Sequence, residues 1–120
     1  MPTGGEYMEQ SNVQALAFDS MVHGRGAVAL AGTAVALSTA TIERGGDYVQ
    51  TGTNTLFQSI TVKAPSSNTG LLYVGGLNVS SLNGFELEAG AAINLNLRNL
   101  EDIFVDVSVS TEIFLFFGVL

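Results

Sequence analysis

The sequence has no cysteine, no tryptophan and a single histidine among its 120 residues. Without cysteine the chain has no disulfide framework, no thiol nucleophile and no zinc–thiolate site. A single imidazole also excludes metal centres that need two or more histidines. These absences remove several classes of enzyme and leave the redox compartment undecided.

Charge is also scarce, and most of it is negative. Charged residues make up 12% of the chain, with 4 basic residues against 11 acidic ones and a net charge of −7. That is about half the usual share of charged residues. The bases, Arg25, Arg44, Lys63 and Arg98, are scattered along the chain. They are too few to neutralise a phosphate backbone or an anionic bilayer, so we predict neither a nucleic-acid nor a membrane partner.

One uncharged stretch, residues 27–42, is mostly small or apolar. A membrane-spanning helix needs about 20 residues, and this stretch is shorter and contains Gly32. The acidic segment before it also differs from a signal peptide. We therefore interpret residues 27–42 as two strands around a turn.

Hydrophobic residues make up 47% of the chain, which is high for a chain with so little charge. A small monomer normally stays soluble through a densely charged surface. We interpret part of this surface as covered by other copies of the chain or by a partner. The alternative interpretation is a plain neutral β-protein surface.

The alternation of apolar and polar residues predicts strands and no long helix. The clearest strands cover 55–64, 91–98 and 103–110, and 21–26 is expected to be a loop. Short strands separated by turns predict an all-β chain forming an antiparallel β-sandwich, jelly-roll-like in arrangement. The predicted sandwich domain covers residues 13–120. Residues 1–12 lack periodicity and form the predicted extended N-terminal arm.

The last strand, residues 112–119, is apolar on both faces. We expect the set that begins at Ile113 to face the core, which turns Phe114 and Phe116 outward. Two large rings in water indicate a subunit interface, most simply around a three-fold axis. The alternative is a central strand covered by a loop or by the N-terminal segment.

Few residues could carry out catalysis. His23 has Asp19 near it in sequence, but no strained nucleophile turn accompanies any serine. Glu86 and Glu88 share a strand face like a glycosidase pair, yet a solvated edge that discourages sheet pairing explains them equally well. We therefore predict no catalytic residues, no cofactor and no enzymatic activity.

Metal binding and modification have weak signals. Glu101 and Asp102 with Asp106 could suggest calcium, but the sequence lacks a dedicated calcium-binding loop. We predict no metal site. Asn78-Val79-Ser80 matches the glycosylation acceptor pattern, which is common by chance.

A longer pattern over about residues 27–117 resembles one that recurs in small virion proteins of tailed bacteriophages. It consists of a strand ending in Lys-Ala, an Asn-Thr-Gly turn, a Tyr-Val-Gly strand end, an Asn-Gly turn and a later glycine. The matching residues are Ile60-Thr61-Val62-Lys63-Ala64, Asn68-Thr69-Gly70, Tyr73-Val74-Gly75, Asn78-Val79-Ser80, Asn83-Gly84-Phe85-Glu86-Leu87 and Gly90. Gly32-Thr33-Ala34-Val35-Ala36-Leu37, Asn99-Leu100 and Ile103-Phe104-Val105 fit the flanking strands.

The resemblance implies a structural role as a capsid decoration, or cement, protein on the capsid exterior of the virion. A homo-oligomer, most simply a trimer, would bind the major capsid protein and stabilise the shell. From the composition of the arm we expect Tyr7 and Met8 to contact the shell. The alternative is a module of a head fibre or tail adsorption apparatus that binds a host glycan or receptor, for which Tyr48 and Tyr73 offer a meagre aromatic platform.

Overall fold

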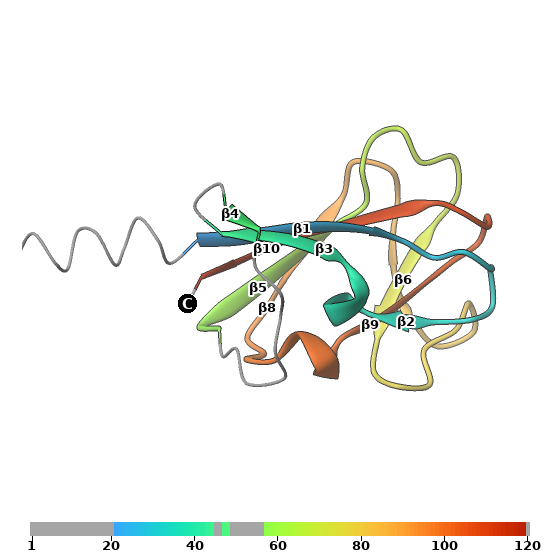
Figure 1. Cartoon of the computed structure of the whole chain (residues 1–120). Coiled ribbons are helices and arrows are strands. Elements are labelled where there is room, and N and C mark those ends of the chain that lie inside the picture. The colour runs from blue at the N-terminus through green and yellow to red at the C-terminus, as the bar shows by residue number, and fades with distance from the viewer. Residues whose placement is uncertain (1–20, 45–46, 49–56, 120) are drawn as a thin grey trace, which may run out of the picture.

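The computed structural model describes residues 21–44, 47–48 and 57–119, which form two packed sheets (Figure 1). The described strands are β1 (Met21–Ala27), β2 (Val35–Ala36), β3 (Thr41–Arg44), β4 (Asp47–Tyr48), β5 (Ser59–Lys63), β6 (Leu72–Gly75), β7 (Phe85–Leu87), β8 (Ala92–Leu95), β9 (Phe104–Val107) and β10 (Ile113–Val119). Two short 3-10 helices, η1 (Leu37–Thr39) and η2 (Leu100–Asp102), complete the described elements. In this part of the chain no helix has the length and hydropathy needed to cross a bilayer.

The strand pairs are nested one inside another. The innermost pair is β6–β7, followed outward by β5–β8, β2–β9 and β1–β10, and every pair is antiparallel. Rolling this long hairpin gives a six-stranded sheet in the order β4-β3-β1-β10-β5-β8 and a four-stranded sheet in the order β2-β9-β6-β7. With the β3–β4 hairpin set aside, this is the eight-stranded jelly roll. The predicted all-β, jelly-roll-like sandwich is confirmed.

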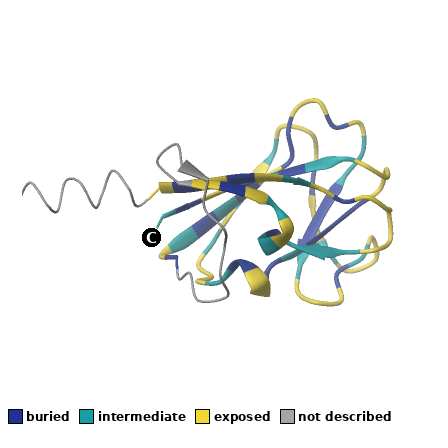
Figure 2. Ribbon diagram, viewed as in Figure 1, coloured by how far each residue is buried: buried dark blue, intermediate teal, exposed yellow. Residues whose placement is uncertain are grey.

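The core lies between the two sheets and follows from the two-residue period of the strands. Ile60 and Val62 of β5 point inward to meet Val105 and Val107 of β9, and all four are buried. Figure 2 shows buried residues on strands of both sheets, with intermediate and exposed residues between them. The strand predicted over 55–64 is confirmed for residues 59–63.

The predicted orientation of the last strand is wrong. Phe114 and Phe116 are 0% and 3% exposed and belong to the core, so they cannot form the predicted surface interface. In the β1–β10 register Phe114 lies opposite Gly26 and Phe116 opposite Gly24. Because these glycines have no side chain, the two rings occupy the space above β1. The alternate residues of β10 consequently face outward.

Two other local predictions are also wrong. The expected loop over 21–26 is strand β1, in which buried Val22 alternates with exposed His23 and Arg25. Its two glycines looked like breakers but are positions on the inner face. Conversely, residues 28–34 are a connection rather than a strand, with Leu30 63% exposed and Gly32 at a φ of +93°.

Some predictions fall outside the described residues. The N-terminal arm, with its expected shell contacts Tyr7 and Met8, belongs to this group, as does Asp19, the sequence neighbour considered for His23. These expectations remain predictions.

Candidate binding surface

The outer face of the six-stranded sheet carries an unusual combination of side chains, which we call the β10 face. It is made by the outward residues of five neighbouring strands. They are Met21, His23 and Arg25 of β1; Thr41 and Glu43 of β3; Ser59, Thr61 and Lys63 of β5; Ala92 and Asn94 of β8; and Ile113, Leu115, Phe117 and Val119 of β10. Four apolar side chains in a row along β10 therefore form the middle of the face.

Two cations flank this apolar row. In the strand register Leu115 lies opposite Arg25 on one side and opposite Lys63 on the other. Neither cation forms an ion pair with any described residue. The face therefore exposes, beside apolar surface, positive charge that no described residue neutralises, on a chain whose net charge is −7.

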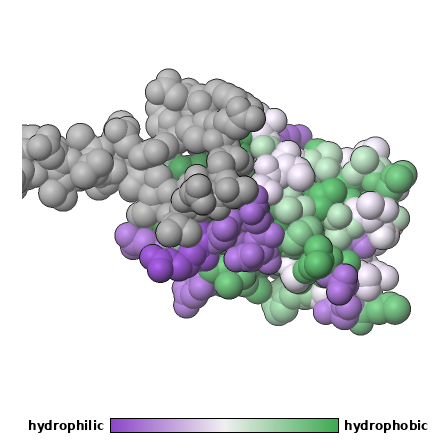
Figure 3. All heavy atoms as spheres, turned by 60° about the horizontal axis from the view of Figure 1, so that its bottom comes forward, coloured by the Kyte–Doolittle hydropathy of each residue, from purple (hydrophilic) through white to green (hydrophobic). Residues whose placement is uncertain are grey.

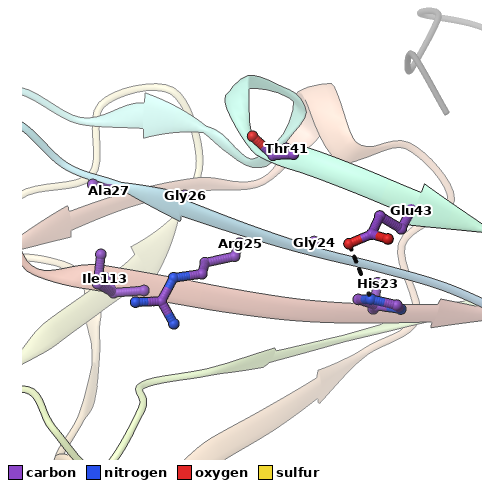
Figure 4. Close-up of a pocket in the computed structure, with 8 residues that line it drawn as sticks. All are labelled: His23, Gly24, Arg25, Gly26, Ala27, Thr41, Glu43 and Ile113. Atoms are coloured by element: carbon purple, nitrogen blue, oxygen red, sulfur yellow. Dashed lines mark ion pairs between the residues drawn. The ribbon is translucent and has the colours of Figure 1, made fainter. Parts of the chain in front are cut away.

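The row next to Leu115 contains an imidazole and a carboxylate. His23 of β1 lies between Phe117 of β10 and Glu43 of β3. His23 Nε2 is 3.9 Å from Glu43 Oε2, and both side chains are exposed. Figure 4 shows these two side chains turned toward each other, with Arg25 extending across β10 toward Ile113. An exposed pair of this kind contributes little to stability, typically about 0–1 kcal/mol.

Two hollows are open on the β10 face. One, of about 400 Å³, is the hollow of Figure 4, which has a mixed polar and apolar lining from β1, β3 and Ile113 of β10. The other, of about 300 Å³, is almost entirely apolar and is lined by His23, Gly24, Thr61, Lys63, Ala92, Leu115, Phe116 and Phe117. Phe117 is 39% exposed at this second hollow, which we call the apolar groove. An open apolar groove with cations beside it is suited to binding rather than to proton transfer.

The acidic residues considered for chemistry lie apart from this face. Glu86 lies on β7, at the edge of the four-stranded sheet, and it and Glu88 are exposed, which agrees with the solvated-edge interpretation. Asp106 is 1% exposed, and its Oδ1 accepts hydrogen bonds from the backbone N–H of Gly32 at 2.9 Å and of Val107 at 2.8 Å. Its carboxylate thus ties β9 to the 28–34 connection. In the described part of the chain no three metal-ligating residues come together.

A second hollow region lies on the opposite sheet. Tyr73 and Asp106 are register partners on the outer side of β6 and β9, and serines from neighbouring segments complete a polar hollow of about 420 Å³. Tyr73 is only 5% exposed there. Its ring therefore does not form the open aromatic platform that a sugar-binding site would use.

Sequence reasoning missed a projecting loop between β6 and β7, residues 76–84. Leu77 and Leu82 are 71% and 94% exposed in it. Asn83 holds the loop closed, because its Oδ1 accepts from the Ser80 N–H at 2.8 Å and its Nδ2 donates to the Asn78 carbonyl at 3.3 Å. Buried Val79 anchors the loop from below. The available signal was a pair of leucines between Gly75-Gly76 and Asn83-Gly84, where a turn alone would need no apolar residue.

The space-filling view of Figure 3 shows hydrophobic and hydrophilic residues grouped in different parts of one face of the molecule. Hydrophobic patches gather at the end of the molecule far from the grey atoms, and hydrophilic residues concentrate nearer to them. Singly exposed apolar residues are normal, whereas grouped ones mark interaction sites. The exposed apolar residues in both the β10 face and the 76–84 loop therefore indicate binding surfaces.

Comparisons with known proteins identify no family. No protein-family model matches the chain, and no curated protein matches its sequence. The structure is similar to part of IMPa from Pseudomonas aeruginosa, solved in complex with an O-glycopeptide, with a TM-score of 0.46 and 10% identity over 84% of this chain. The chain spans 12% of that protein's length. It is also similar to the tobacco streak virus coat protein, with a TM-score of 0.38, 8% identity and coverage of 84% of this chain and 86% of that one. A virus coat protein is thus a distant structural neighbour, but neither likeness carries an argument about function.

Proposed function

We propose that the protein is a non-enzymatic structural component of a virion, a capsid decoration protein that binds the exterior of the shell as a trimer and stabilises it. The observation that carries the proposal is the β10 face, an open apolar and cationic surface without a catalytic cluster among the described residues. A chain that exposes such a surface while holding only 12% charged residues is suited to assembly.

The resemblance to small phage virion proteins supports the same role. The Asn83-Gly84 turn and the Gly90 turn of that pattern are the turns that start β7 and precede β8. Jelly rolls occur in viral capsid proteins and also in lectins, so the fold alone does not decide between shell binding and glycan binding. The buried ring of Tyr73 favours shell binding.

The mechanism is mechanical rather than chemical. A trimer presents each of its contacts three times, and several modest contacts acting together raise the effective affinity for the shell. Clamping adjacent major capsid protein subunits raises the work needed to separate them under the pressure of packaged DNA. Tyr7 and Met8 are the proposed shell contacts of the arm.

The test is co-sedimentation of the purified protein with assembled heads of the particle encoded by the same genome. We expect saturable binding to heads, together with a higher temperature of head rupture. The double variant Tyr7→Ser with Met8→Ser removes both proposed shell contacts of the arm and should reduce the occupancy of sites on the heads. Leu30→Ser changes an exposed leucine outside the proposed contacts and should leave the occupancy unchanged. Absence of binding to heads by the folded protein would overturn the proposal, and selective capture on a glycan array would favour the adsorption role.

A further inference from the structure

Two described surfaces of the chain complement each other in apolar character and charge. We propose that copies of the chain associate head to tail, with the 76–84 loop of one copy seated in the apolar groove on the β10 face of the next. This inference names the contact within the oligomer of the proposed function. It does not depend on shell binding, so the isolated protein can test it.

The groove provides the receiving half of the contact. It is an open hollow of about 300 Å³ whose lining includes Leu115 and exposed Phe117. The groove lies over β10, which is held between β1 and β5 in the interior of the sheet, so its floor is rigid. An aliphatic side chain that enters it removes apolar surface from water on both partners.

The loop provides the inserting half. Leu82 is 94% exposed and Leu77 71% exposed, yet the backbone that carries them is fixed by the Asn83 hydrogen bonds and by buried Val79. A projecting group held in place before binding loses less conformational entropy on association than a flexible one. The loop therefore has the features of a preformed anchor.

Charge favours a contact between the loop and the groove over a contact between two β10 faces. Arg25 and Lys63 stand on either side of Leu115 in the receiving face, and the loop leads into β7 with exposed Glu86 and Glu88. When the loop of one copy enters the groove of the next, opposite charges come together. Two β10 faces packed centrally against each other would instead bring like charges together, which opposes binding.

The two halves belong to different sheets of one molecule. The loop connects β6 and β7 of the four-stranded sheet, whereas the groove is on the six-stranded sheet. One copy can therefore give its loop to one neighbour and receive the loop of another. Such a heterologous contact produces a closed ring when the rotation between copies closes, and an open filament when it does not.

The experiment is sedimentation velocity on the purified full chain over a concentration series. We expect the wild type to form oligomers and Leu82→Asp to lower its affinity for itself at least about 100-fold, since the aliphatic anchor is lost and a carboxylate must be desolvated to enter the apolar groove. Leu30→Asp, a matched exposed leucine in the 28–34 connection, should leave the oligomer unchanged. A monomeric wild type, or an intact Leu82→Asp oligomer, would overturn the inference.

The receiving half is tested with Lys63→Glu, an exposed change that spares the apolar core. This variant should associate weakly, and adding Glu86→Lys and Glu88→Lys to it should recover part of the loss. In a mixture of Leu82→Asp with Lys63→Glu, the first retains an intact groove and the second an intact loop. We expect these to form heterodimers and no larger species.

Failure of the mixture to form heterodimers, while each variant keeps the wild-type melting temperature, would show that another surface joins the copies. Binding to heads tests the proposed function separately from oligomer formation. Oligomers that form through this contact but do not bind heads would leave the inference standing and overturn the decoration role.

Discussion

Individual residues of β1 and β10 determine which face of the central strand is buried. Gly24 and Gly26 leave the space into which the Phe116 and Phe114 rings fit, and a Cβ at either glycine would overlap the facing ring. The pairing works like a glycine covered by a cross-strand aromatic ring. It explains why two of the largest apolar side chains of β10 lie inside.

Gly24→Ala should therefore destabilise the protein. The added methyl group must displace the Phe116 ring in a packed core, and overpacking of this kind costs about 1–3 kcal/mol. Urea denaturation gives the change in free energy of unfolding. Gly76→Ala is the matched control, because a Cβ there meets no atom within 4 Å and Gly76 has no positive φ. Equal effects of the two substitutions would contradict the packing explanation.

Glu112 is one residue through which stability should depend on acid. Its carboxylate accepts hydrogen bonds from the backbone N–H of Thr69 at 2.5 Å and of Gly70 at 2.8 Å and from the Thr69 hydroxyl at 3.1 Å. The hydrogen bond from the Thr69 N–H is the main cause that lowers the pKa of Glu112 below its ordinary value of 4.5. Because the pKa is lower in the folded state, the carboxylate stabilises the fold above pH 4.5, and this contribution is lost as the pH falls through the folded pKa.

Glu112→Gln should accordingly lower the melting temperature at pH 7, because the amide loses the charge that strengthens these hydrogen bonds. The difference between variant and wild type should shrink as the pH falls below 4.5 and through the lowered pKa of the wild-type carboxylate. Thermal unfolding followed by circular dichroism measures the difference in melting temperature between variant and wild type at pH 7 and at pH 3. A melting-temperature difference that does not change with pH would argue against a role for the charge of Glu112.

At the scale of elements, β5 and β10 show what the sequence could predict. β5 alternates Ile60 and Val62 with Thr61 and Lys63, so its buried face is readable from polarity. β10 is apolar at nearly every position, and a strand shifted by one residue exchanges its faces. The choice depends on the facing glycines of β1, and recognising their role requires the pairing of two strands about 90 residues apart in the chain.

The β10 face could not be predicted from the sequence for the same reason. Arg25, Leu115 and Lys63 come from three strands and become neighbours only through the register. The alternation along β5 places Lys63 on the face opposite to Ile60, but no local pattern connects it to Arg25. The turns were easier to predict from the sequence, because Asn83-Gly84 and Gly90 specify their own backbone geometry.

Asn68 joins a loop to the start of β10 as if it were a short piece of strand. Its Nδ2 donates to the Ile113 carbonyl at 2.8 Å, and its Oδ1 accepts from the Ile113 N–H at 3.2 Å. Asn68→Ala leaves both backbone groups of Ile113 without this partner, so we expect a loss of about 1–3 kcal/mol. The Ile113 amide should also exchange its hydrogen faster.

Hydrogen exchange at Ile113 and denaturation of the same variant measure the two effects. Asn68→Asp provides a comparison, since its carboxylate can still accept from the N–H but cannot donate to the carbonyl. An intermediate loss for Asn68→Asp is expected. Slow exchange at Ile113 in Asn68→Ala would show that the contact does not hold β10.

For the whole molecule, the nested topology predicts an order of local stability. β10 is paired on both sides along the six-stranded sheet, whereas three-residue β7 lies at a sheet edge. Local opening requires least energy where few contacts are lost. Hydrogen exchange should therefore be slowest in the inner amides of β10 and β1 and faster in the edge strand β7, and rapid exchange throughout β10 would contradict this order.

The same arrangement has a consequence for biosynthesis. Met21 and Val119 are register partners, and β10 separates β1 from β5. While a ribosome is still adding residues 113–119, β1 and β5 have no strand to connect them, and their apolar inner faces stay uncovered. Folding of the larger sheet must then follow emergence of its final strand, and a premature stop codon only a few residues before that strand would yield a chain that cannot close its core.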